Sequence, residues 1–407
     1  MKYVVMLGDG MADHPTKKLG GKTPLQCSFT PYLDQISAEG TIGLIDTIPA
    51  GFTPGSDVAN LSVLGYDPAQ TYTGRGPLEA ASMGISLAPN DIAYRCNLVT
   101  IGENNSSQAF MDDFTAGHIS TKEARDIIQD INKQLGSSQL QFYPGVGYRH
   151  LLVWRNATSS PSTIPPHDIS GKIIAEHLPR GNFAEEVNSL MQKAGEILES
   201  HPINEQRRAA GKKQANAIWL WGQGKKPQII PLTQKYNLQG GMISAVDLLN
   251  GLGTIAGLKV IRVPGATGYI DTNYEGKAKA ALDALKFMDF IFIHLEAPDE
   301  MGHEGNAEGK IRAIEFFDEK IVGIILNNIG VFGDYRLLVL SDHPTPLDIK
   351  THVSDPSPFA VLSSRKDENR ASGVPFNEIT AKDSGILISP GHLLMEKFIR
   401  DWRSLIG

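Results

Sequence analysis

An aspartate and a histidine stand directly after an apolar run in this sequence, at Asp342 and His343. The run before them, residues 335–340, reads Tyr-Arg-Leu-Leu-Val-Leu and predicts a buried strand. Side chains at the carboxyl end of such a strand lie where open α/β sheets bind their ligands. Together with His352, which follows shortly after in the sequence, Asp342 and His343 offer oxygen and nitrogen ligands. The alternative interpretation is an aspartate that ends a strand beside an exposed histidine.

Two other predicted strand ends repeat this pattern. The apolar run 290–295 is followed by Asp299 and His303, which are close enough in sequence to reach one metal ion from a turn or a helical start. The run 3–7 is followed by Asp9, whose flanking glycines let another group come close. Asp-Gly is also an ordinary turn sequence, so Asp9 alone is ambiguous.

Ser56 adds a hydroxyl group in a second kind of position. It follows a Pro-Gly pair and precedes an apolar helical stretch, which places it at a predicted helix amino terminus. Free N–H groups and the helix dipole favour anions there. The alternative is that Ser56 or Asp57 is only an N-cap, and the two interpretations are compatible. Arg75, between two glycines, is a plausible phosphate contact.

Carboxylate, imidazole and hydroxyl groups together suggest metal-assisted phosphoryl transfer. Carboxylate and imidazole ligands suit Zn²⁺ or Mn²⁺ rather than a soft metal. Two such ions roughly 4 Å apart can clamp the attacking and leaving oxygens of an in-line phosphoryl displacement. A serine hydroxyl beside them can ionise near neutral pH and act as nucleophile. The candidate ligands for the two-metal site are Asp9, Ser56, Asp299, His303, Asp342, His343 and His352.

The elements that must position these residues alternate between strand and helix on both sides of an interruption. This order predicts an α/β fold, a mostly parallel sheet flanked by helices, with a smaller α/β domain inserted in it. We assign 1–87 and 216–407 to the metal-binding domain and 88–215 to an inserted, substrate-binding domain. Further predicted strands are 41–48, 92–101, 148–154, 217–221, 258–263 and 359–362, and predicted helices are 31–39, 121–135, 243–255, 273–286, 311–324 and 392–405.

Composition excludes several other classes of protein. The chain has 407 residues, 41% hydrophobic and 20% charged, which is an ordinary globular balance. A net charge of −7 without a basic block argues against nucleic-acid binding. Two cysteines, Cys27 and Cys96, support neither a disulfide framework nor a Cys-based zinc site. No apolar run approaches ~18 residues, and the first residues run straight into the Asp9 motif, so we expect a cytoplasmic enzyme that does not bind membranes.

Long motifs make the sequence recognisable, and they are spread over nearly the whole chain. They are Gly8–Asp13, Pro54–Asn60, Gly65–Pro68, Thr73–Ala80, Gly265–Tyr269, Ala297–Glu300 with Gly302-His303, and Ser341–Pro346. In these motifs the chain resembles the alkaline-phosphatase superfamily, and more closely the archaeal-type cofactor-independent phosphoglycerate mutases. The resemblance implies one metal ion held by Asp299, His303 and His352, and another held by Asp9, Ser56, Asp342 and His343.

The resemblance further implies that 2-phosphoglycerate and 3-phosphoglycerate are interconverted through a phosphoserine at Ser56. Two divalent ions are implied: Mn²⁺, Zn²⁺ or Co²⁺, with Mg²⁺ as a further candidate. An inserted domain that closes over the site would retain the glycerate and exclude water, which would otherwise make the enzyme a phosphatase. Candidate substrate-binding residues are Arg75, Arg95, His118, Arg149, His150 and Lys277; apart from Arg75, each is equally interpretable as a surface or helix-capping residue.

Two other functions are compatible with parts of the pattern. A relative that kept the metal site but phosphorylates another small substrate, such as a homoserine kinase-like enzyme or a phosphopentomutase, has the same metal motifs. No Walker-type loop is present, so a nucleotide would have to bind unconventionally. A non-enzymatic metal-binding protein would leave Ser56 without a purpose. The sequence leaves the native metal, the phospho-acceptor, the oligomeric state and the domain boundaries undecided.

Overall fold

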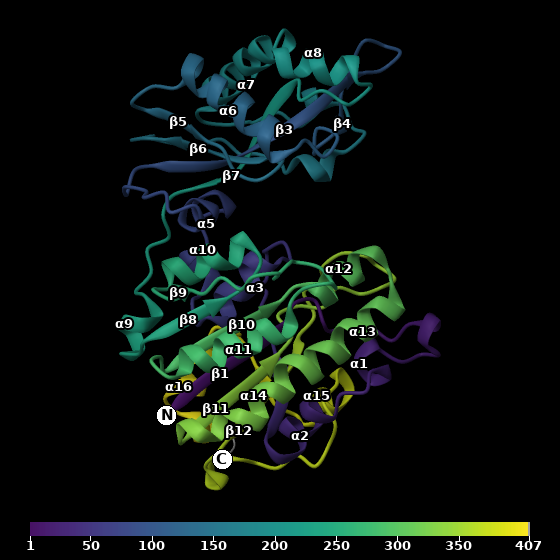
Figure 1. The fold of residues 1–407 in the computed structure, drawn as a ribbon, viewed down its shortest axis with the longest axis vertical. Coiled ribbons are helices and arrows are strands. Elements are labelled where there is room, and N and C mark those ends of the chain that lie inside the picture. Colours follow the sequence, from purple (N-terminus) through teal and green to yellow (C-terminus); the bar gives the residue numbers. More distant parts are fainter. Residues whose placement is uncertain (406–407) are drawn as a thin grey trace. The chain divides into compact units, whose positions relative to one another are not determined.

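The computed structural model describes residues 1–405, which form two compact units. The larger unit combines Met1–Tyr72 with Gln228–Gly407, and the smaller unit is the intervening segment Thr73–Pro227. Figure 1 shows each unit with its own sheet and its own covering helices. The chain is therefore a discontinuous larger unit that flanks a continuous smaller one in sequence.

A mixed, mostly parallel sheet is the centre of the larger unit (Figure 1). Its central strands β11, β1, β10 and β8 are parallel to one another, whereas β12 is antiparallel to both of its neighbours. The order across the sheet is β13 (Leu387–Ile388), β2 (Thr41–Ile45), β12 (Ser357–Ser363), β11 (Tyr335–Leu340), β1 (Lys2–Gly8), β10 (Phe290–Leu295), β8 (Gly240–Ile243) and β9 (Lys259–Val260).

Helices cover both faces of this sheet, which explains why its strands are continuous apolar runs. On one face, Val4 and Met6 of β1 join a core with residues of α2, α11, α13 and α14. On the other face, the ring of Tyr3 packs edge-on against Phe398 of α16. The helices of this unit are α1 (Pro24–Cys27), α2 (Pro31–Glu39), α3 (Ser56–Val63), α4 (Pro68–Thr71), α9 (Leu232–Tyr236), α10 (Asp247–Ile255), α11 (Tyr274–Leu285), α12 (Ala297–Glu304), α13 (Ala307–Phe317), α14 (Gly323–Asn328), α15 (Glu378–Asp383) and α16 (Leu393–Ile399).

The smaller unit contains an antiparallel sheet. Strands β4 (Ala109–Asp113), β3 (Ile92–Glu103), β6 (Arg149–Trp154) and β5 (Leu140–Tyr143) follow in that order, and β7 (Ala217–Gly224) also pairs with β3. Its main core lies between the sheet and the helices α6 (Thr121–Leu135) and α7 (Ala184–Glu199), around Ile127, Ile131 and Leu190. Helices α5 (Arg75–Ser82) and α8 (Pro202–Ala209) complete the unit.

Helix α5 places the border of the smaller unit earlier than the sequence analysis did. Ala80 of α5 packs with Ala93 and Leu151 of the antiparallel sheet, so the helix belongs to this unit. The predicted borders at residues 88 and 215 therefore lie inside the segment Thr73–Pro227. Sequence periodicity identifies a helix but does not say which sheet it packs against.

Three predicted helices differ from the observed ones. The predicted helix 392–405 is shorter in the structure, where α16 ends at Ile399 and a separate 3₁₀ turn follows at Trp402–Leu405. The predicted helix 243–255 begins too early, since residue 243 is the last residue of β8 and α10 begins at Asp247. The sequence did not show this border, because a short apolar run is compatible with either a buried strand or a helix. The predicted helix 311–324 is interrupted by a π-helical turn at Asp318–Val322. Across residues 1–405, no helix is long and apolar enough to cross a membrane.

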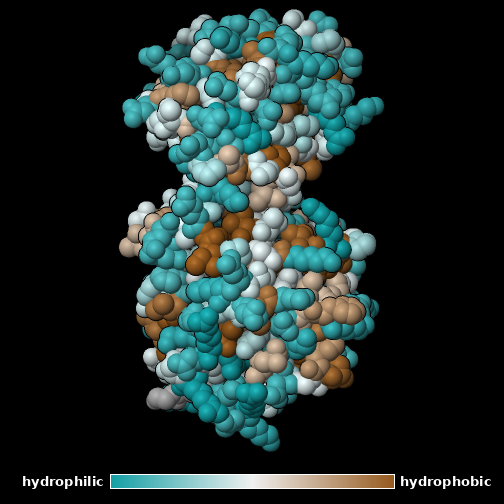
Figure 2. Space-filling model, turned by 90° about the vertical axis from the view of Figure 1, so that its left-hand side faces the viewer, coloured by the Kyte–Doolittle hydropathy of each residue, from teal (hydrophilic) through white to brown (hydrophobic). Residues whose placement is uncertain are grey.

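The surface view in Figure 2 is mainly hydrophilic, with hydrophobic side chains gathered in patches. The most exposed large hydrophobic side chains among the described residues are Val331, Phe287 and Phe29, at 81%, 79% and 77%. None of them lies within a sheet strand or an α-helix. The apolar side chains of the central strands are thus buried inside the two units and do not form these exposed positions.

Candidate metal centre

The carboxyl ends of three adjacent parallel strands bring the predicted metal ligands together. Strand β1 lies between β10 and β11, with Leu7 opposite Leu340 and Gly8 opposite Leu295. Asp9 follows β1, Asp342 follows β11, and α12 begins two residues after β10 ends. Because parallel strands end at the same edge of a sheet, their terminal loops share one site.

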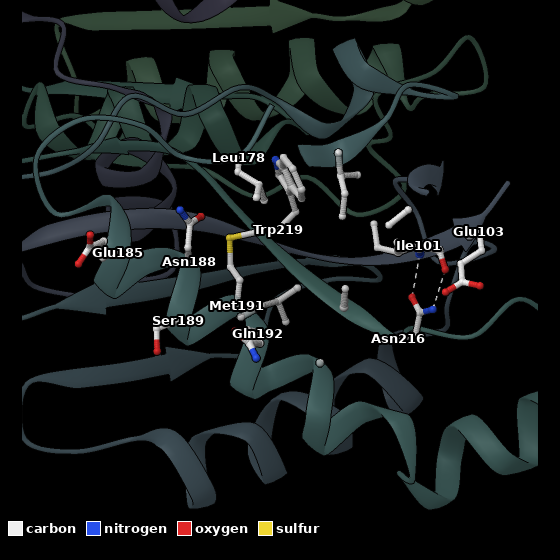
Figure 3. Close-up of a pocket in the computed structure, with 16 residues that line it drawn as sticks. Ile101, Glu103, Leu178, Glu185, Asn188, Ser189, Met191, Gln192, Asn216 and Trp219 are labelled. Atoms are coloured by element: carbon white, nitrogen blue, oxygen red, sulfur yellow. Dashed lines mark hydrogen bonds between the residues drawn. The ribbon is translucent and has the colours of Figure 1, made fainter. Parts of the chain in front are cut away.

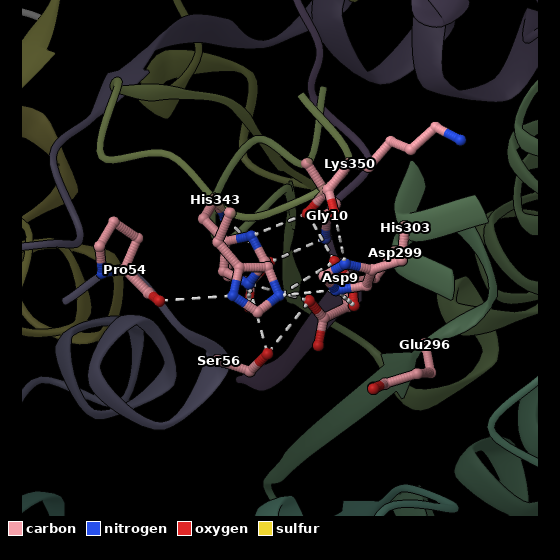
Figure 4. A network of polar contacts seen from close by, with 12 residues as sticks. Asp9, Gly10, Pro54, Ser56, Glu296, Asp299, His303, His343 and Lys350 are labelled. Carbon is pink, nitrogen blue, oxygen red and sulfur yellow. Dashed lines mark hydrogen bonds and ion pairs between the residues drawn. The ribbon is translucent and has the colours of Figure 1, made fainter. Parts of the chain in front are cut away.

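One group of ligand atoms is formed by Asp299, His303 and His352. Figure 4 labels Asp299 and His303 of this group. The His303 Nε2 lies 3.1 Å from Asp299 Oδ2 and 3.0 Å from His352 Nε2. Asp299 Oδ1 lies 3.5 Å from His352 Nε2. Two imidazole nitrogens and a carboxylate that face one another at these distances form the donor set that Zn²⁺ or Mn²⁺ prefers.

A second group is formed by Asp9, Asp342 and His343, whose side chains are fully buried. One ligand atom from each lies within 4.8 Å of the others. The hydroxyl of Ser56 is close by, with Oγ 3.5 Å from Asp9 Oδ1 and 3.3 Å from His343 Nε2. The structure therefore places Ser56 beside the second group.

Ser56 is the first residue of α3, and the N-cap is Gly55. The Ser56 side chain makes no capping hydrogen bond, so the interpretation of Ser56 as an N-cap is wrong. Its hydroxyl instead points toward the ligand groups, as Figure 4 shows. The backbone N–H groups and dipole of the helix start favour an anion near this hydroxyl.

In the part of the chain that the structure describes, the buried carboxylates of these ligand groups are paired with histidines and not with lysines or arginines. Within residues 1–405, no Lys or Arg side chain bonds to Asp9, Asp299 or Asp342. Burial alone raises the pKa of Asp9, but hydrogen bonds from His294 and His343 hold it below its usual range. Burial and the charge of Asp9 raise the pKa of Asp342 well above its usual range. Buried carboxylates that have no Lys or Arg partner fit a site for divalent cations.

The neighbouring carboxylates raise the pKa of two histidines in the cluster. Burial lowers the pKa of His343, but the charges of Asp342 and Asp9 outweigh it and raise this pKa to about 10. A hydrogen bond with Asp299 raises the pKa of His303 to about 9. Because a metal ion binds the neutral imidazole, metal binding at these histidines would release protons.

Gly10 shows that the backbone approaches this cluster closely. Its N–H donates to Asp342 Oδ1 at 3.1 Å, and its φ of +57° lies in the left-handed region. A Cβ at this position would lie 2.6 Å from Thr345 Oγ1 and closer still to Asp299 Oδ1. The glycines that flank Asp9 predict a close approach of other groups, and at Gly10 these groups are Asp299 and Thr345.

Several supporting residues were not found from the sequence. The amide of Asn60 donates to Asp342 Oδ2 at 2.8 Å and to the backbone oxygen of Ser56 at 2.9 Å. The buried Lys310 donates to Asp13 Oδ2 at 2.8 Å and to the Thr345 carbonyl at 2.9 Å. Asn60 lies one helical turn after Ser56, which is a signal that the sequence did contain.

His294 and Glu296 also adjoin the cluster. His294 Nε2 lies 2.7 Å from Asp9 Oδ2 and 3.5 Å from Glu296 Oε2. Burial, followed by the charge of Asp9, raises the pKa of Glu296 well above its usual range. The histidine in the apolar run Phe-Ile-Phe-Ile-His-Leu was the sequence signal that went unused.

Three of the predicted substrate-binding residues form a positive cluster in the smaller unit. The guanidinium groups of Arg95 and Arg75 lie 4.5 Å and 5.8 Å from the ring centre of Trp221. Arg95 Nε lies 3.0 Å from Glu79 Oε1. Burial lowers the pKa of Arg95 to about 10, and although Glu79 opposes this, the charges of Arg75 and Arg149 add to it. Three neighbouring guanidinium groups with one carboxylate favour an anionic ligand.

The other three candidates are placed differently. His118 is exposed in a turn, where its backbone N–H donates to Thr115 Oγ1. His150 is 1% exposed, its Nδ1 accepts from the Gly145 N–H, and burial lowers its pKa to about 3. Lys277 is fully buried, and its Nζ donates to the His294 carbonyl at 2.9 Å. Neither His150 nor Lys277 is open to a substrate, because both face the interior of their units.

A cavity of about 850 Å³ lies in the smaller unit, between α7 and the strands β3 and β7 (Figure 3). Apolar side chains such as Leu178, Met191 and Trp219 line much of it, and Asn216 closes one side by bonding to the backbone of Ile101. None of the predicted site residues lines this cavity.

Comparison with known proteins agrees with the geometry. The family model described as 2,3-bisphosphoglycerate-independent phosphoglycerate mutase matches residues 37–204. A probable enzyme of that name from Geobacter sulfurreducens is 52% identical over 399 residues, covering 98% of this chain and 100% of the relative. The enzyme of that name from Methanosarcina barkeri is 52% identical over 388 residues, covering 95% and 96%.

Solved structures show the same fold over the full length. A protein from Pyrococcus horikoshii has a TM-score of 0.82 and 30% identity, covering 99% of this chain and 97% of the other. The cofactor-independent phosphoglycerate mutase from Thermoplasma acidophilum has a TM-score of 0.67 and 25% identity, covering 98% and 99%.

Proposed function

Since the chain belongs to the family of 2,3-bisphosphoglycerate-independent phosphoglycerate mutases, we propose that it works through a phosphoserine at Ser56 beside two divalent metal ions. The enzyme interconverts 2-phosphoglycerate and 3-phosphoglycerate. The observation that carries the proposal is the position of the Ser56 hydroxyl, at a helix start and 3.5 Å from Asp9 Oδ1 in a buried acidic cluster. The related kinase-like and phosphopentose functions are not favoured, because the full-length relatives are named as phosphoglycerate mutases.

The residues divide into two ligand sets. We assign Asp299, His303 and His352 to one ion, and Asp9, Ser56, Asp342 and His343 to the other. When bound, the two ions supply positive charge that neutralises phosphoryl oxygens and lowers the pKa of the serine hydroxyl. Mn²⁺, Zn²⁺, Co²⁺ and Mg²⁺ are the candidate ions, and the first three suit the imidazole ligands better.

The transfer conserves every atom of the substrate. Ser56 Oγ loses its proton and forms a bond to phosphorus, while the ester bond to glycerate breaks and the glycerate oxygen takes up a proton. In the return step the other glycerate hydroxyl gives up its proton and bonds to phosphorus, while the Oγ–phosphorus bond breaks and Ser56 Oγ takes up a proton again. Water does not enter the balance, so the glycerate must stay bound between the two steps.

The smaller unit is proposed to bind the substrate through its arginines. Arg75, Arg95 and Arg149 provide planar donors that match carboxylate and phosphate oxygens. Stacking on Trp221 and the contact with Glu79 fix the Arg95 group before any ligand arrives. Because a guanidinium group offers paired donors in a fixed plane as well as a charge, we assign the arginines to orienting the glycerate as well as to holding it.

A trapping experiment tests the proposal. Purified enzyme with Mn²⁺ is mixed with 3-phosphoglycerate, quenched in acid and digested for mass spectrometry, and elemental analysis measures metal in the same preparation. We expect a phosphate on Ser56 and two metal ions per chain. Active enzyme with no label on Ser56 would refute the phosphoserine, and active metal-free enzyme would refute the metal site. Cell fractionation tests the predicted cytoplasmic location.

A further inference from the structure

A hydrogen-bonded chain lies beneath Asp9 and crosses three neighbouring strands. His294, the penultimate residue of β10, is fully buried, and its Nε2 lies 2.7 Å from Asp9 Oδ2. Its Nδ1 lies 3.2 Å from the hydroxyl of Ser244, which directly follows β8. Because β1, β10 and β8 are adjacent, the three side chains form one row along the carboxyl edge of the sheet.

The donors of this chain have a fixed direction. The ionised carboxylate of Asp9 only accepts, so His294 Nε2 carries the hydrogen and donates. In a neutral ring Nδ1 is then the acceptor, and it receives the hydroxyl hydrogen of Ser244. The Ser244 oxygen accepts in turn from the Val246 N–H at 3.0 Å, just before α10. The hydrogen bond that reaches Asp9 is thus anchored in the backbone.

The two oxygens of Asp9 have different surroundings. Oδ2 faces His294, whereas Oδ1 lies 3.2 Å from His343 Nε2 and 3.5 Å from the Ser56 hydroxyl. Holding Oδ2 stops rotation of the carboxylate about its Cβ–Cγ bond and keeps Oδ1 directed at Ser56. Partners of this kind orient ligands and tune their affinity for a metal.

We propose that His294 is a positioning residue, which holds Asp9 in the orientation that binds the metal ion beside Ser56. The inference rests on the proposed function, since it needs Asp9 to be a metal ligand. Lys277 supports the same arrangement, because its buried ammonium group fixes the His294 carbonyl. This gives the buried lysine a role in the structure without contact to substrate.

A third metal ion is the rival explanation for these residues. Asp9, His294 and Glu296 have ligand atoms within 4.8 Å of one another. However, the 2.7 Å contact is the length of a charge-assisted hydrogen bond. While Nε2 donates to Asp9 it has no lone pair for a metal, so the geometry favours positioning over ligation.

Metal titration of three proteins tests the inference. Metal-free wild type, His294→Leu and His294→Gln are titrated with Mn²⁺ by calorimetry, and bound Mn²⁺ is followed by electron paramagnetic resonance. We expect two equivalents in the wild type, and in His294→Leu about a 10- to 100-fold weaker affinity for one of them. His294→Gln should regain much of this loss, because its amide group donates at a similar reach.

Further variants separate positioning from loss of structure. Ser244→Ala removes the hydroxyl group that holds the His294 ring, so it should weaken binding of the same Mn²⁺ ion by a smaller factor. If His294→Leu fails to fold, Ser244→Ala still tests the hydrogen-bonded row of Asp9, His294 and Ser244. Ile293→Val is the matched control, since Ile293 is buried on the same strand but points to the opposite face. It should bind both equivalents as the wild type does.

Each outcome decides something. A wild type that binds no Mn²⁺ refutes the proposed function and this inference together. Two equivalents in the wild type with unchanged affinities in His294→Leu and Ser244→Ala refute the inference alone. The inference would also be overturned if His294→Leu weakened the binding of both Mn²⁺ ions equally. It would be overturned as well if the wild type bound a third Mn²⁺ ion that His294→Leu no longer binds. Weakening of one equivalent, with rescue by His294→Gln, supports it.

Discussion

Replacing Ser56 with alanine removes the proposed nucleophile and leaves the start of α3 intact. The helix is capped by Gly55, and the Ser56 hydroxyl makes contacts of 3.3 Å to His343 Nε2 and 3.5 Å to Asp9 Oδ1. Contacts of this length contribute no more than an ordinary hydrogen bond, about 1 kcal/mol. The expected fall in melting temperature is therefore about 2–4 °C at most for a chain of this size.

Activity should respond on a different scale. A methyl group cannot carry a phosphoryl group, and loss of a nucleophile from a catalytic unit costs about 10⁴-fold or more. We expect Ser56→Ala to be folded, to bind metal and to lack mutase activity, with traces of phosphatase at most. Circular dichroism, metal analysis and formation of 2-phosphoglycerate from 3-phosphoglycerate are measured on one preparation.

Ser62→Ala provides the matched control on the same helix. Its hydroxyl is buried and donates to the Thr47 carbonyl at 2.6 Å, so its loss should destabilise the fold at least as much as Ser56→Ala does. It should nevertheless keep most of the activity. A folded, metal-loaded Ser56→Ala protein that turns over within about tenfold of the wild type would show that the phosphoserine mechanism is wrong.

Four further results are expected. Chelation should abolish turnover, and Mn²⁺, Co²⁺ or Zn²⁺ should restore it; full activity in protein shown by elemental analysis to be metal-free would contradict this. Turnover of rigorously purified substrate should not need added 2,3-bisphosphoglycerate, and a strict requirement for the bisphosphate would exclude Ser56 as the carrier. Gly10→Ala should weaken metal binding and lower kcat by at least about tenfold, because its Cβ would displace Asp299 and Thr345 in a left-handed backbone; wild-type kinetics in this variant would count against the geometry. His150 has a folded pKa of about 3, below its unfolded value near 6.5, so the folded state binds fewer protons and stability falls as pH drops from about 6.5 toward 3. The loss at pH 5 is about 2 kcal/mol, and calorimetry between pH 5 and 8 should show less pH dependence for His150→Gln than for the wild type; equal slopes would contradict the burial argument.

Much of the candidate site could be predicted from the sequence because strand ends are visible in it. Asp9 and Asp342 follow apolar runs, and the ends of parallel strands must meet at one edge of a sheet. The same reasoning placed Ser56 at a helix start, which the structure has at α3. These predictions depend on local periodicity and on one topological rule, so they needed no knowledge of which side chains touch.

Supporting contacts and burial could not be obtained in this way. His294 reaches Asp9 and Ser244 only because β10 lies between β1 and β8, and nothing in the order of residues states that neighbourhood. His150 and Lys277 have the residue types of substrate ligands, yet both are turned into the interior of their units. Whether a polar side chain faces solvent or core depends on what packs over it.

The sequence by itself predicted the chemistry that we propose for this protein: the types of candidate ligand, the serine proposed as nucleophile, and the strand ends that carry the ligands. Only the tertiary structure decided which side chains hydrogen-bond to the candidate ligands, and to which of the two units α5 belongs. The physical reason is the range of the interactions involved. Strands and helix starts follow from neighbours along the chain, whereas the orientation of a buried carboxylate depends on hydrogen bonds between residues hundreds of positions apart, such as Asp9 and His294.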